Sequence, residues 1–479
     1  MNPDPTPVQL DDIQAIVGSG LAGLRHARYW LLHVERPDDV RVWLRQLLDA
    51  GLVKSVADLG RGQGGSLHRE AAMVAFSHAG LARLGVCEHD DHPFPSAFRE
   101  GMDTPQREQL FADDPHAGWD WSDAAGSAFQ AHLLVAHFWA DGAVPDARLD
   151  AQALSAAGMR ALQVRSCPSA FSTPAPGEAT VMHEPFGFRD GIGQPVLHGF
   201  PRSRGECEAQ RLAGERFDNR VVATGEFVLG YTNEYHEPAY CPDVQGWPQP
   251  PGAPRFGHNG SYLAVRQICQ DVEAFKRFEQ SVAIPEIGAK MMGRYSSGQT
   301  LVQHPRAPAE IDAFRYLVDD AHGFQCPRGA HARRANPRDG LASDVASGIA
   351  ASKLHRLLRR GRVYASACAA QAAGAACNGD AARRGCGEGL LFIALNADLD
   401  RQFEFVQQRW IAGSGFGDLR DEQDPILGTS EQRCVTVQGL PVGTRIGPLP
   451  RFATVHGGGY FFLPGLKALR FVAEPGGAG

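Results

Sequence analysis

The chain has 479 residues, of which 43% are hydrophobic and 21% are charged. This composition is typical of a folded protein with a large buried core and excludes a disordered or fibrous chain. The formal net charge of -7 argues against a surface built to neutralise phosphates, so we expect no nucleic-acid partner. No run of about 18 apolar residues is present, which excludes a transmembrane helix and a membrane partner. The acidic, proline-rich residues 1–12 contain neither a basic nor an apolar stretch, and we therefore predict a cytoplasmic location.

Cysteine spacing excludes several metal and redox motifs. The ten cysteines include no Cys-x-x-Cys pair, so a thioredoxin-like motif, a paired zinc knuckle and covalent attachment of a c-type haem are not expected. Cys368, Cys377 and Cys386 lie in the Ala/Gly-rich segment 366–387, which we interpret as a surface loop rather than a metal or disulfide site.

Strand and helix patterns alternate twice in the N-terminal half. Residues 27–35 are rich in aromatic and branched side chains and predict a strand, and residues 37–51 carry apolar side chains at the helical spacing i, i+3, i+4 and i+7. A second strand is expected up to Phe76, followed by a short helix that Ser77 caps.

The C-terminal half repeats this order. Residues 261–280 predict a strand, a cap at Asp271 and a helix, and residues 390–410 predict a strand, a cap at Asp398 or Asp400 and a helix. Strand, acidic cap and helix at comparable lengths in both halves predict an α+β fold of two ferredoxin-like domains, with antiparallel sheets and peripheral helices. We place these domains at residues 1–185 and 186–479.

The segment EPFGFRDGIGQP, residues 184–195, places a carboxylate on a tight turn. Gly187, Gly191 and Gly193 permit positive φ angles or a close backbone approach. Asp190, held among these glycines, is well placed to point into a cavity. The alternative is an Asp-Gly turn in which the Asp190 side chain only caps its own backbone.

The segment CPRGAHARRANPRD, residues 326–339, contains one histidine among small neighbours. Gly329 and Ala330 leave room for a flat ring to approach His331 closely, as a haem-ligating imidazole requires. A structural histidine is the alternative. The arginines that follow either meet haem propionates or face solvent. Cys326 offers a thiolate instead, but the phenylalanine and glycines expected around a cytochrome P450 thiolate are missing.

Three further segments carry conspicuous patterns. Residues 353–364, KLHRLLRRGRVY, alternate basic and apolar side chains, which is compatible with a solvated strand or helix face and with a polyanion site. Residues 289–298, AKMMGRYSSG, place Arg294 next to a glycine, and residues 225–235, GEFVLGYTNEY, predict a buried strand.

Taken in order, these segments closely resemble the dye-decolourising peroxidase family. The family hallmark, Gly-x-x-Asp-Gly, is here Gly187-Phe188-Arg189-Asp190-Gly191, and the likeness runs from about Asp12 to about Leu466. The resemblance implies a haem b peroxidase, with one non-covalent haem per chain held mainly by the C-terminal domain. It also implies that the enzyme reduces hydrogen peroxide to water through Compound I and oxidises bulky aromatic donors such as dyes and phenols.

The resemblance assigns two catalytic residues. Asp190 matches the distal aspartate, and Arg359 best matches the distal arginine, with Arg356 and Arg360 as alternatives. Peroxide cleavage needs a base that moves a proton from the inner to the outer oxygen, and a cation that stabilises the developing negative charge. An aspartate acts as this base only when ionised, and its low ordinary pKa favours turnover at acidic pH.

The resemblance also assigns the residues that bind the cofactor. His331 matches the proximal ligand of the haem iron, and Arg294 is similar to the arginine that approaches a haem propionate. Asp398 is similar to the acidic partner of the proximal imidazole, with Asn396 as its competitor. An acidic partner would give His331 imidazolate character and support high-valent iron.

Bulky donors do not fit a buried site, so we expect surface aromatic residues to relay electrons, with Trp247, Tyr364 and Trp410 as candidates and core packing as the alternative. Two rival functions stay open: iron release from haem, and a non-catalytic haem carrier or sensor. The acidic net charge argues against a nucleic-acid module built on residues 353–362. A homo-oligomer is compatible with the sequence.

Overall fold

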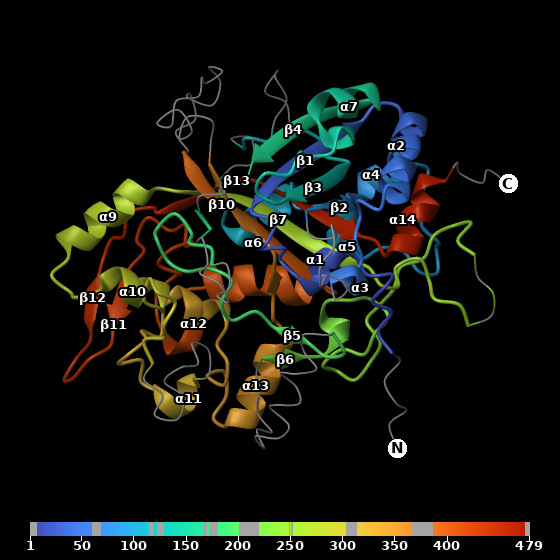
Figure 1. Cartoon of the computed structure of the whole chain (residues 1–479). Helices are drawn as coiled ribbons and strands as arrows, with labels where there is room; N and C mark the ends of the chain where they lie inside the picture. Colours follow the sequence, from blue (N-terminus) through green and yellow to red (C-terminus); the bar gives the residue numbers. More distant parts are fainter. Residues whose placement is uncertain are drawn as a thin grey trace.

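Strands from both halves of the chain form one nine-stranded sheet (Figure 1). Its order is β4-β1-β3-β2-β13-β7-β10-β8, and β9 also pairs with β10. The computed structural model describes residues 7–59, 69–114, 119–121, 129–165, 170–171, 181–200, 220–248, 250, 252–302, 314–365 and 387–474. The predicted surface loop, apart from its last residue, lies outside the described residues.

The N-terminal strands have the ferredoxin-like order. They lie in the order β4-β1-β3-β2 with every neighbouring pair antiparallel, and α2 and α7 connect β1 to β2 and β3 to β4. The elements are β1 (His26–Val34), α2 (Pro37–Asp49), β2 (Glu70–Phe76), β3 (Leu133–Trp139), α7 (Ala151–Ala156) and β4 (Met159–Arg165).

The C-terminal strands repeat this arrangement in the order β13-β7-β10-β8, again antiparallel throughout. Helix α9 follows β7, and a helix with π-type hydrogen bonds follows β10. The elements are β7 (Ser261–Gln270), α9 (Val272–Ser281), β8 (Leu358–Arg359), β9 (Arg362–Ala365), β10 (Glu388–Asn396), the π-helical stretches Asp400–Glu404 and Val406–Ile411, and β13 (Ala453–Leu463).

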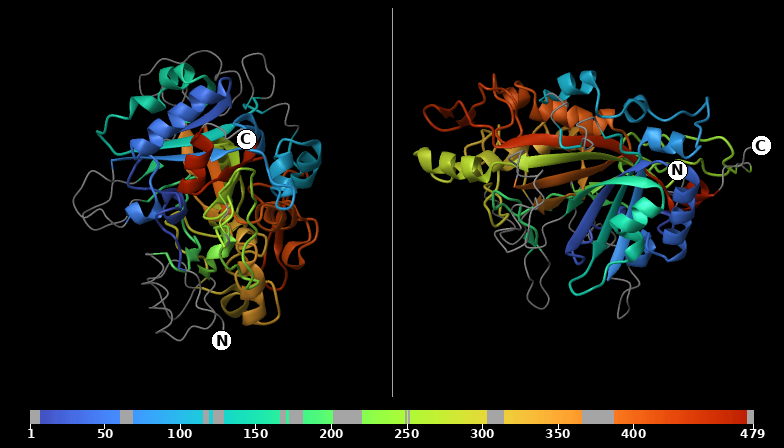
Figure 2. Two further views of the ribbon diagram at one scale, coloured as in Figure 1. Left: turned by 90° about the vertical axis from the view of Figure 1, so that its right-hand side faces the viewer. Right: turned by 90° about the horizontal axis from the view of Figure 1, so that it is seen from above.

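The two sets of strands join where Phe76 of β2 pairs with Phe462 of β13. Figure 2 shows them from above as a blue-to-teal and a yellow-to-red group that meet in one twisted sheet. The predicted α+β fold with antiparallel sheets is confirmed, whereas the boundary at residue 185 stays a prediction.

Shorter helices surround the sheet. Those of the N-terminal half are α1 (Ala15–Gly18), α3 (Val56–Leu59), α4 (His78–Arg83), α5 (Ser96–Glu100) and α6 (Pro105–Phe111). Those of the C-terminal half are α10 (Ile287–Met292), α11 (Tyr316–Asp319), α12 (His331–Ala335), α13 (Val345–Lys353) and α14 (Leu466–Ala473). Two small sheets pair β5 (Val196–Leu197) with β6 (Val221–Val222) and β11 (Val435–Val437) with β12 (Thr444–Ile446).

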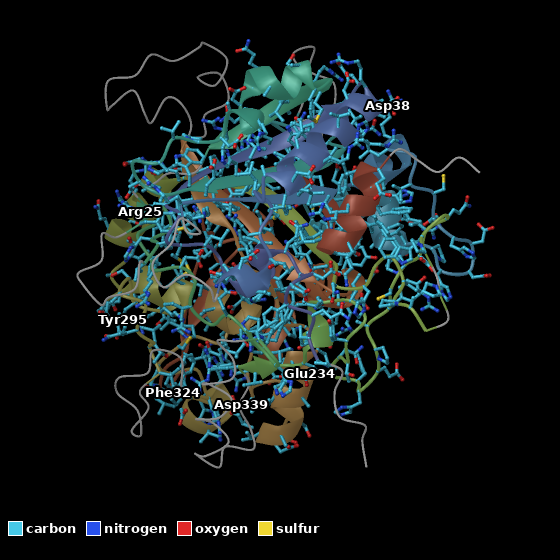
Figure 3. All side chains as sticks on the ribbon, turned by 45° about the vertical axis from the view of Figure 1, so that its right-hand side comes forward. Arg25, Asp38, Glu234, Tyr295, Phe324 and Asp339 are labelled. Carbon is cyan, nitrogen blue, oxygen red and sulfur yellow. The ribbon has the colours of Figure 1, made fainter. Side chains whose placement is uncertain are left out.

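Local sequence features explain where the helices begin and which face they bury. The Ser77 hydroxyl accepts a hydrogen bond from the Gly80 N–H, and Asp271 accepts one from the Ala274 N–H, so both predicted caps are confirmed. Helix α2 buries Val40, Trp43, Leu44, Leu47 and Leu48, while Asp38 in its first turn is exposed (Figure 3).

Both faces of the sheet are covered by apolar side chains. In β1, Trp30, Leu32 and Val34 belong to one apolar cluster, and the alternate residues Tyr29 and Leu31 belong to another. Among the described residues, no helix combines the length and apolarity needed to cross a membrane.

Candidate active site

A cavity of about 240 Å³ lies against the C-terminal strands and is lined from several elements. Its walls come from β7, β10 and β13, from the turn at residues 188–193, from α12 and from the π-helical segment. The apolar side chains in these walls include Phe188, Ile268, Met292, Leu390, Phe392, Phe403 and Ile426. This cavity is also lined by four polar residues that the sequence predicted to act in the site: Asp190, Arg294, His331 and Arg359.

Asp190 lies at the end of a short hairpin. Its N–H donates to the Met182 carbonyl at 2.8 Å, and the hairpin turns at Gly187, whose φ is 95°. One carboxylate oxygen, Oδ1, accepts from the Gly191 N–H at 2.6 Å and lies 3.4 Å from Nη2 of Arg359. The side chain therefore caps its own turn, as one interpretation expected, and also faces the cavity.

The structure separates the three candidate arginines. Arg359 pairs with Asp190, and its Nη2 also donates to the Ile192 carbonyl at 3.0 Å. Arg356 donates to the Gly193 carbonyl at 2.8 Å and lines the same cavity. Arg360 directly follows β8, and its side chain is directed away from this cavity, where it donates to the carbonyls of Ile16 and Val17.

His331 is the first residue of α12 and has a buried carboxylate beside it. Its Nδ1 lies 2.9 Å from Oδ2 of Asp424, whose side chain is fully buried. Burial by itself lowers the pKa of His331, but the charge of Asp424 and the hydrogen bond to it outweigh burial and raise the pKa above its ordinary value. The other carboxylate oxygen of Asp424 accepts from the N–H groups of Ile426 and Leu427, which fixes its orientation.

The expectation that Asp398 is the acidic partner of His331 is wrong. Asp398 Oδ1 accepts from the Arg401 N–H at 3.0 Å, so this carboxylate caps the start of the helix after β10, and it does not line the cavity. Its competitor Asn396 donates to the Ala394 carbonyl instead. No local spacing marks Asp424, which lies 93 residues from His331 along the chain.

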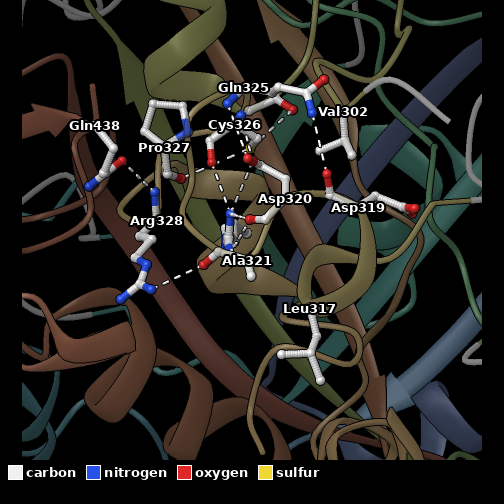
Figure 4. A network of polar contacts seen from close by, with 12 residues as sticks. Val302, Leu317, Asp319, Asp320, Ala321, Gln325, Cys326, Pro327, Arg328 and Gln438 are labelled. Atoms are coloured by element: carbon white, nitrogen blue, oxygen red, sulfur yellow. Dashed lines mark hydrogen bonds and ion pairs between the residues drawn. The ribbon is translucent and has the colours of Figure 1, made fainter. Parts of the chain in front are cut away.

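Two of the arginines after His331 are structural. Arg333 donates to the carboxylate and carbonyl of Asp320, and its guanidinium lies 4.4 Å from the ring centre of Tyr316. The same carboxylate accepts from the N–H groups of Gln325 and Cys326, so it holds the loop that precedes His331 (Figure 4). Arg334 is fully buried and donates to the carbonyls of Gly329, Trp410, Gly413 and Glu422.

Arg338, the third arginine after His331, and Arg294 both lie at the cavity wall. Arg294 donates to the Gly298 carbonyl at 3.1 Å, and its guanidinium lies 5.5 Å from the ring centre of Phe314. Arg338 lies 3.9 Å from the same ring and is 2% exposed. One cavity wall therefore carries two guanidinium groups stacked on one aromatic side chain.

A second cavity of about 410 Å³ adjoins the first. Both are lined by Arg189, Asp190, Arg359 and Gly361. The second is also lined by residues of the 17–22, 181–182 and 194–200 segments and by Arg360 and Arg362. The Asp190–Arg359 pair therefore lies where the two cavities meet.

Comparison with known proteins gives a consistent relationship, although no protein-family model matches the chain. It is 26% identical to the dye-decolorizing peroxidase AauDyP1 of Auricularia auricula-judae, over 97% of this chain and 87% of the relative. It is 30% identical to a dye-decolorizing peroxidase of Exidia glandulosa, over 60% and 55% of the two chains. A solved DyP-type peroxidase from Auricularia auricula-judae superposes with a TM-score of 0.72 at 22% identity, over 98% of this chain and all of that one. The chain is therefore similar to dye-decolourising peroxidases over most of its length, and it shares their fold.

The similarity to dye-decolourising peroxidases implies a haem cofactor, and the residues of the cavity fit one. The Asp424 carboxylate contacts Nδ1 of His331, so Nε2 is the ring nitrogen that can bind iron. The remaining walls are largely apolar, and Arg294 and Arg338 offer positive charge for acidic substituents.

Proposed function

We propose that this protein is a haem b peroxidase that reduces hydrogen peroxide to water and oxidises bulky aromatic donors such as dyes and phenols. His331 would hold the iron of one non-covalent haem, Asp424 would orient the imidazole, and Arg294 would meet a propionate. The observation that carries the proposal is the contact of Asp190 with Arg359, 3.4 Å apart, in the wall of the cavity that His331 also lines.

The haem, when bound, would supply the two electrons that reduce the peroxide. Asp190 acts as the base, because an ionised carboxylate can take the proton from the inner peroxide oxygen and return it to the outer oxygen, which leaves as water. Arg359 donates hydrogen bonds to the outer oxygen as negative charge develops there. The second cavity meets the first at these two residues and offers a route for peroxide to reach them.

The position of the electron relay needs revision. Tyr364 and Trp410 are buried, at 5% and 6% exposed, and Trp247 is half-buried. A bulky donor at the surface would not touch Tyr364 or Trp410 directly. Trp410 belongs to the small apolar cluster that also contains Val406 and Ile411, both of which line the cavity.

Stopped-flow absorbance of the haem-reconstituted protein tests the proposal. Wild-type protein mixed with hydrogen peroxide at acidic pH should change its haem spectrum rapidly. Asp190→Asn should slow this change by about 100-fold to 10,000-fold, because it removes the general base, and His331→Ala should lose the ferric-histidine spectrum. A chain that binds haem but leaves peroxide untouched would refute the peroxidase assignment and favour a haem carrier or sensor.

A further inference from the structure

Glu184 is a buried carboxylate in the wall of the cavity. It is 7% exposed, and burial raises its pKa, which three hydrogen bonds only partly offset. Its Oε1 accepts from the Phe188 N–H at 2.8 Å. Its Oε2 accepts from the Phe186 N–H at 3.0 Å and from Nε2 of Gln270 at 2.6 Å.

These contacts hold the hairpin that carries Asp190. The hairpin closes through the Glu184 N–H to the Phe188 carbonyl and the Asp190 N–H to the Met182 carbonyl. Its turn leaves the N–H groups of Phe186 and Phe188 directed inward, where the Glu184 carboxylate accepts both. A buried N–H without a partner is costly, so this carboxylate maintains the shape of the turn.

Glu184 also ties the hairpin to the sheet. Gln270 is the last residue of β7, and its side-chain amide gives the hairpin a direct link to that strand. The rings of Phe186 and Phe188 pack on Phe275 of α9, at centroid distances of 4.4 and 6.2 Å. The hairpin is therefore attached to the β7–α9 unit by one polar and two aromatic contacts.

We propose that Glu184 is a positioning residue for the peroxide step: with Gln270 it fixes the hairpin so that the Asp190 carboxylate meets Arg359. The inference rests on the proposed function, since the role of Asp190 belongs to it. The 3.4 Å separation of Asp190 and Arg359 is already long for a hydrogen bond, so a small shift of the hairpin separates them. A displacement of about 1 Å at a reacting group lowers a rate by about 100-fold.

The test uses the haem-reconstituted full chain with Glu184→Ala, Glu184→Gln and Gln270→Leu. Glu184→Ala should lower kcat/KM for peroxide by about 10-fold to 100-fold and leave KM for the aromatic donor unchanged. Glu184→Gln keeps one acceptor oxygen but turns its NH2 group toward a backbone N–H, so it should recover only part of the loss. The Glu184→Ala/Gln270→Leu double variant should be no slower than Glu184→Ala, because both changes break the same link.

A second readout does not depend on activity. In the haem-free chain, hydrogen–deuterium exchange of the peptide containing residues 182–191 should be faster in Glu184→Ala and in Gln270→Leu than in the wild type. If Glu184→Ala does not fold, Gln270→Leu carries both measurements.

Asp243→Asn is the matched control. Asp243 is 2% exposed and accepts from the N–H groups of Val244 and Phe256, but it does not line the cavity. This variant should lose thermal stability without a selective loss in the peroxide step.

The outcomes separate this inference from the proposed function. An active wild type with an equally active Glu184→Ala variant overturns the role of Glu184 and leaves the peroxidase assignment standing. A Glu184→Ala variant whose losses in haem affinity and in both half-reactions are uniform, as for a generally destabilised protein, overturns it too. A wild type that does not consume peroxide refutes the proposed function, while hydrogen exchange still reports whether Glu184 anchors the hairpin.

Discussion

Asp424→Asn isolates the contact that orients His331. Asp424 Oδ1 accepts two backbone N–H groups, so an asparagine at this position keeps its amide oxygen there. Its NH2 group then replaces Oδ2, which lies 2.9 Å from Nδ1 of His331. Two donors would face each other unless the imidazole moves its proton to Nε2, the nitrogen expected to bind iron.

The expected losses in stability and in haem affinity follow from these contacts. A hydrogen bond to a buried charged group contributes about 1.5–3 kcal/mol, so the free energy of unfolding of the haem-free chain should fall by about this amount. Haem affinity should fall by about 10-fold to 100-fold, the usual effect of removing the partner of a metal-ligating histidine. Asp398→Asn is the matched control, because Asp398 caps a helix and does not contact His331.

Haem titration followed by Soret absorbance, together with urea denaturation of the haem-free chains, measures both quantities. Asp424→Asn should bind haem weakly with an altered ferric spectrum, and Asp398→Asn should bind it like the wild type. Unchanged affinity and spectrum in Asp424→Asn, with a loss in Asp398→Asn, would refute the reasoning and restore the assignment that the sequence suggested.

Three further predictions concern other parts of the structure. Arg359→Gln should lower kcat/KM for peroxide by about 100-fold or more. Arg360→Gln, measured in the same stopped-flow assay, should lower it far less, because Arg360 lines only the second cavity and does not contact Asp190; equal losses would contradict the assignment of Arg359. Burial, with nearby positive charges, lowers the pKa of His132 to about 4. As the pH falls, the His132 imidazole is therefore protonated in the unfolded chain before it is protonated in the folded chain. His132 should lower the free energy of unfolding of the wild type by about 3 kcal/mol between pH 6.5 and 4. Urea denaturation of the wild type and His132→Gln checks this, and a stability difference that does not change with pH would exclude it. Gly361→Ala would place a Cβ 2.4 Å from the Leu391 carbonyl oxygen. We therefore expect the free energy of unfolding to fall by about 1–3 kcal/mol and peroxide reduction to slow, because Arg359 would shift. An unchanged melting temperature would contradict this prediction.

Elements and caps could be predicted from the sequence because their causes are local. Apolar residues repeat along α2 with the period of a helix, and Ser77 and Asp271 lie where their side chains reach the N–H groups of the first helical turn. The repetition of strand, cap and helix in both halves predicted two ferredoxin-like sets of strands, and the sheet order bears this out.

Part of the candidate site could be predicted for the same reason. The glycines around Asp190 define a tight turn within a few residues, and the small residues before His331 leave space for a flat group. Both features belong to the chain itself, and the structure places both side chains at one cavity.

Partners that come from distant segments were decided only by the tertiary structure. Asp424 meets His331 from 93 residues away, Gln270 meets Glu184 from 86 residues away, and no periodicity links either pair. Arg359 ends β8 and Arg360 is the next residue in the same basic run, yet one side chain contacts Asp190 and the other the Ile16 carbonyl, which only the packing of distant segments decides. The buried strand predicted at residues 225–235 is wrong, because a 3-10 turn at Thr224–Glu226 and further turns occupy this segment. By itself the sequence determined the most regular strands and helices, two helix caps and the turns that present Asp190 and His331, because hydrogen bonds and apolar periodicity act over a few residues. The pairing of Asp424 with His331 and of Asp190 with Arg359 depends on how the sheet and its covering segments pack.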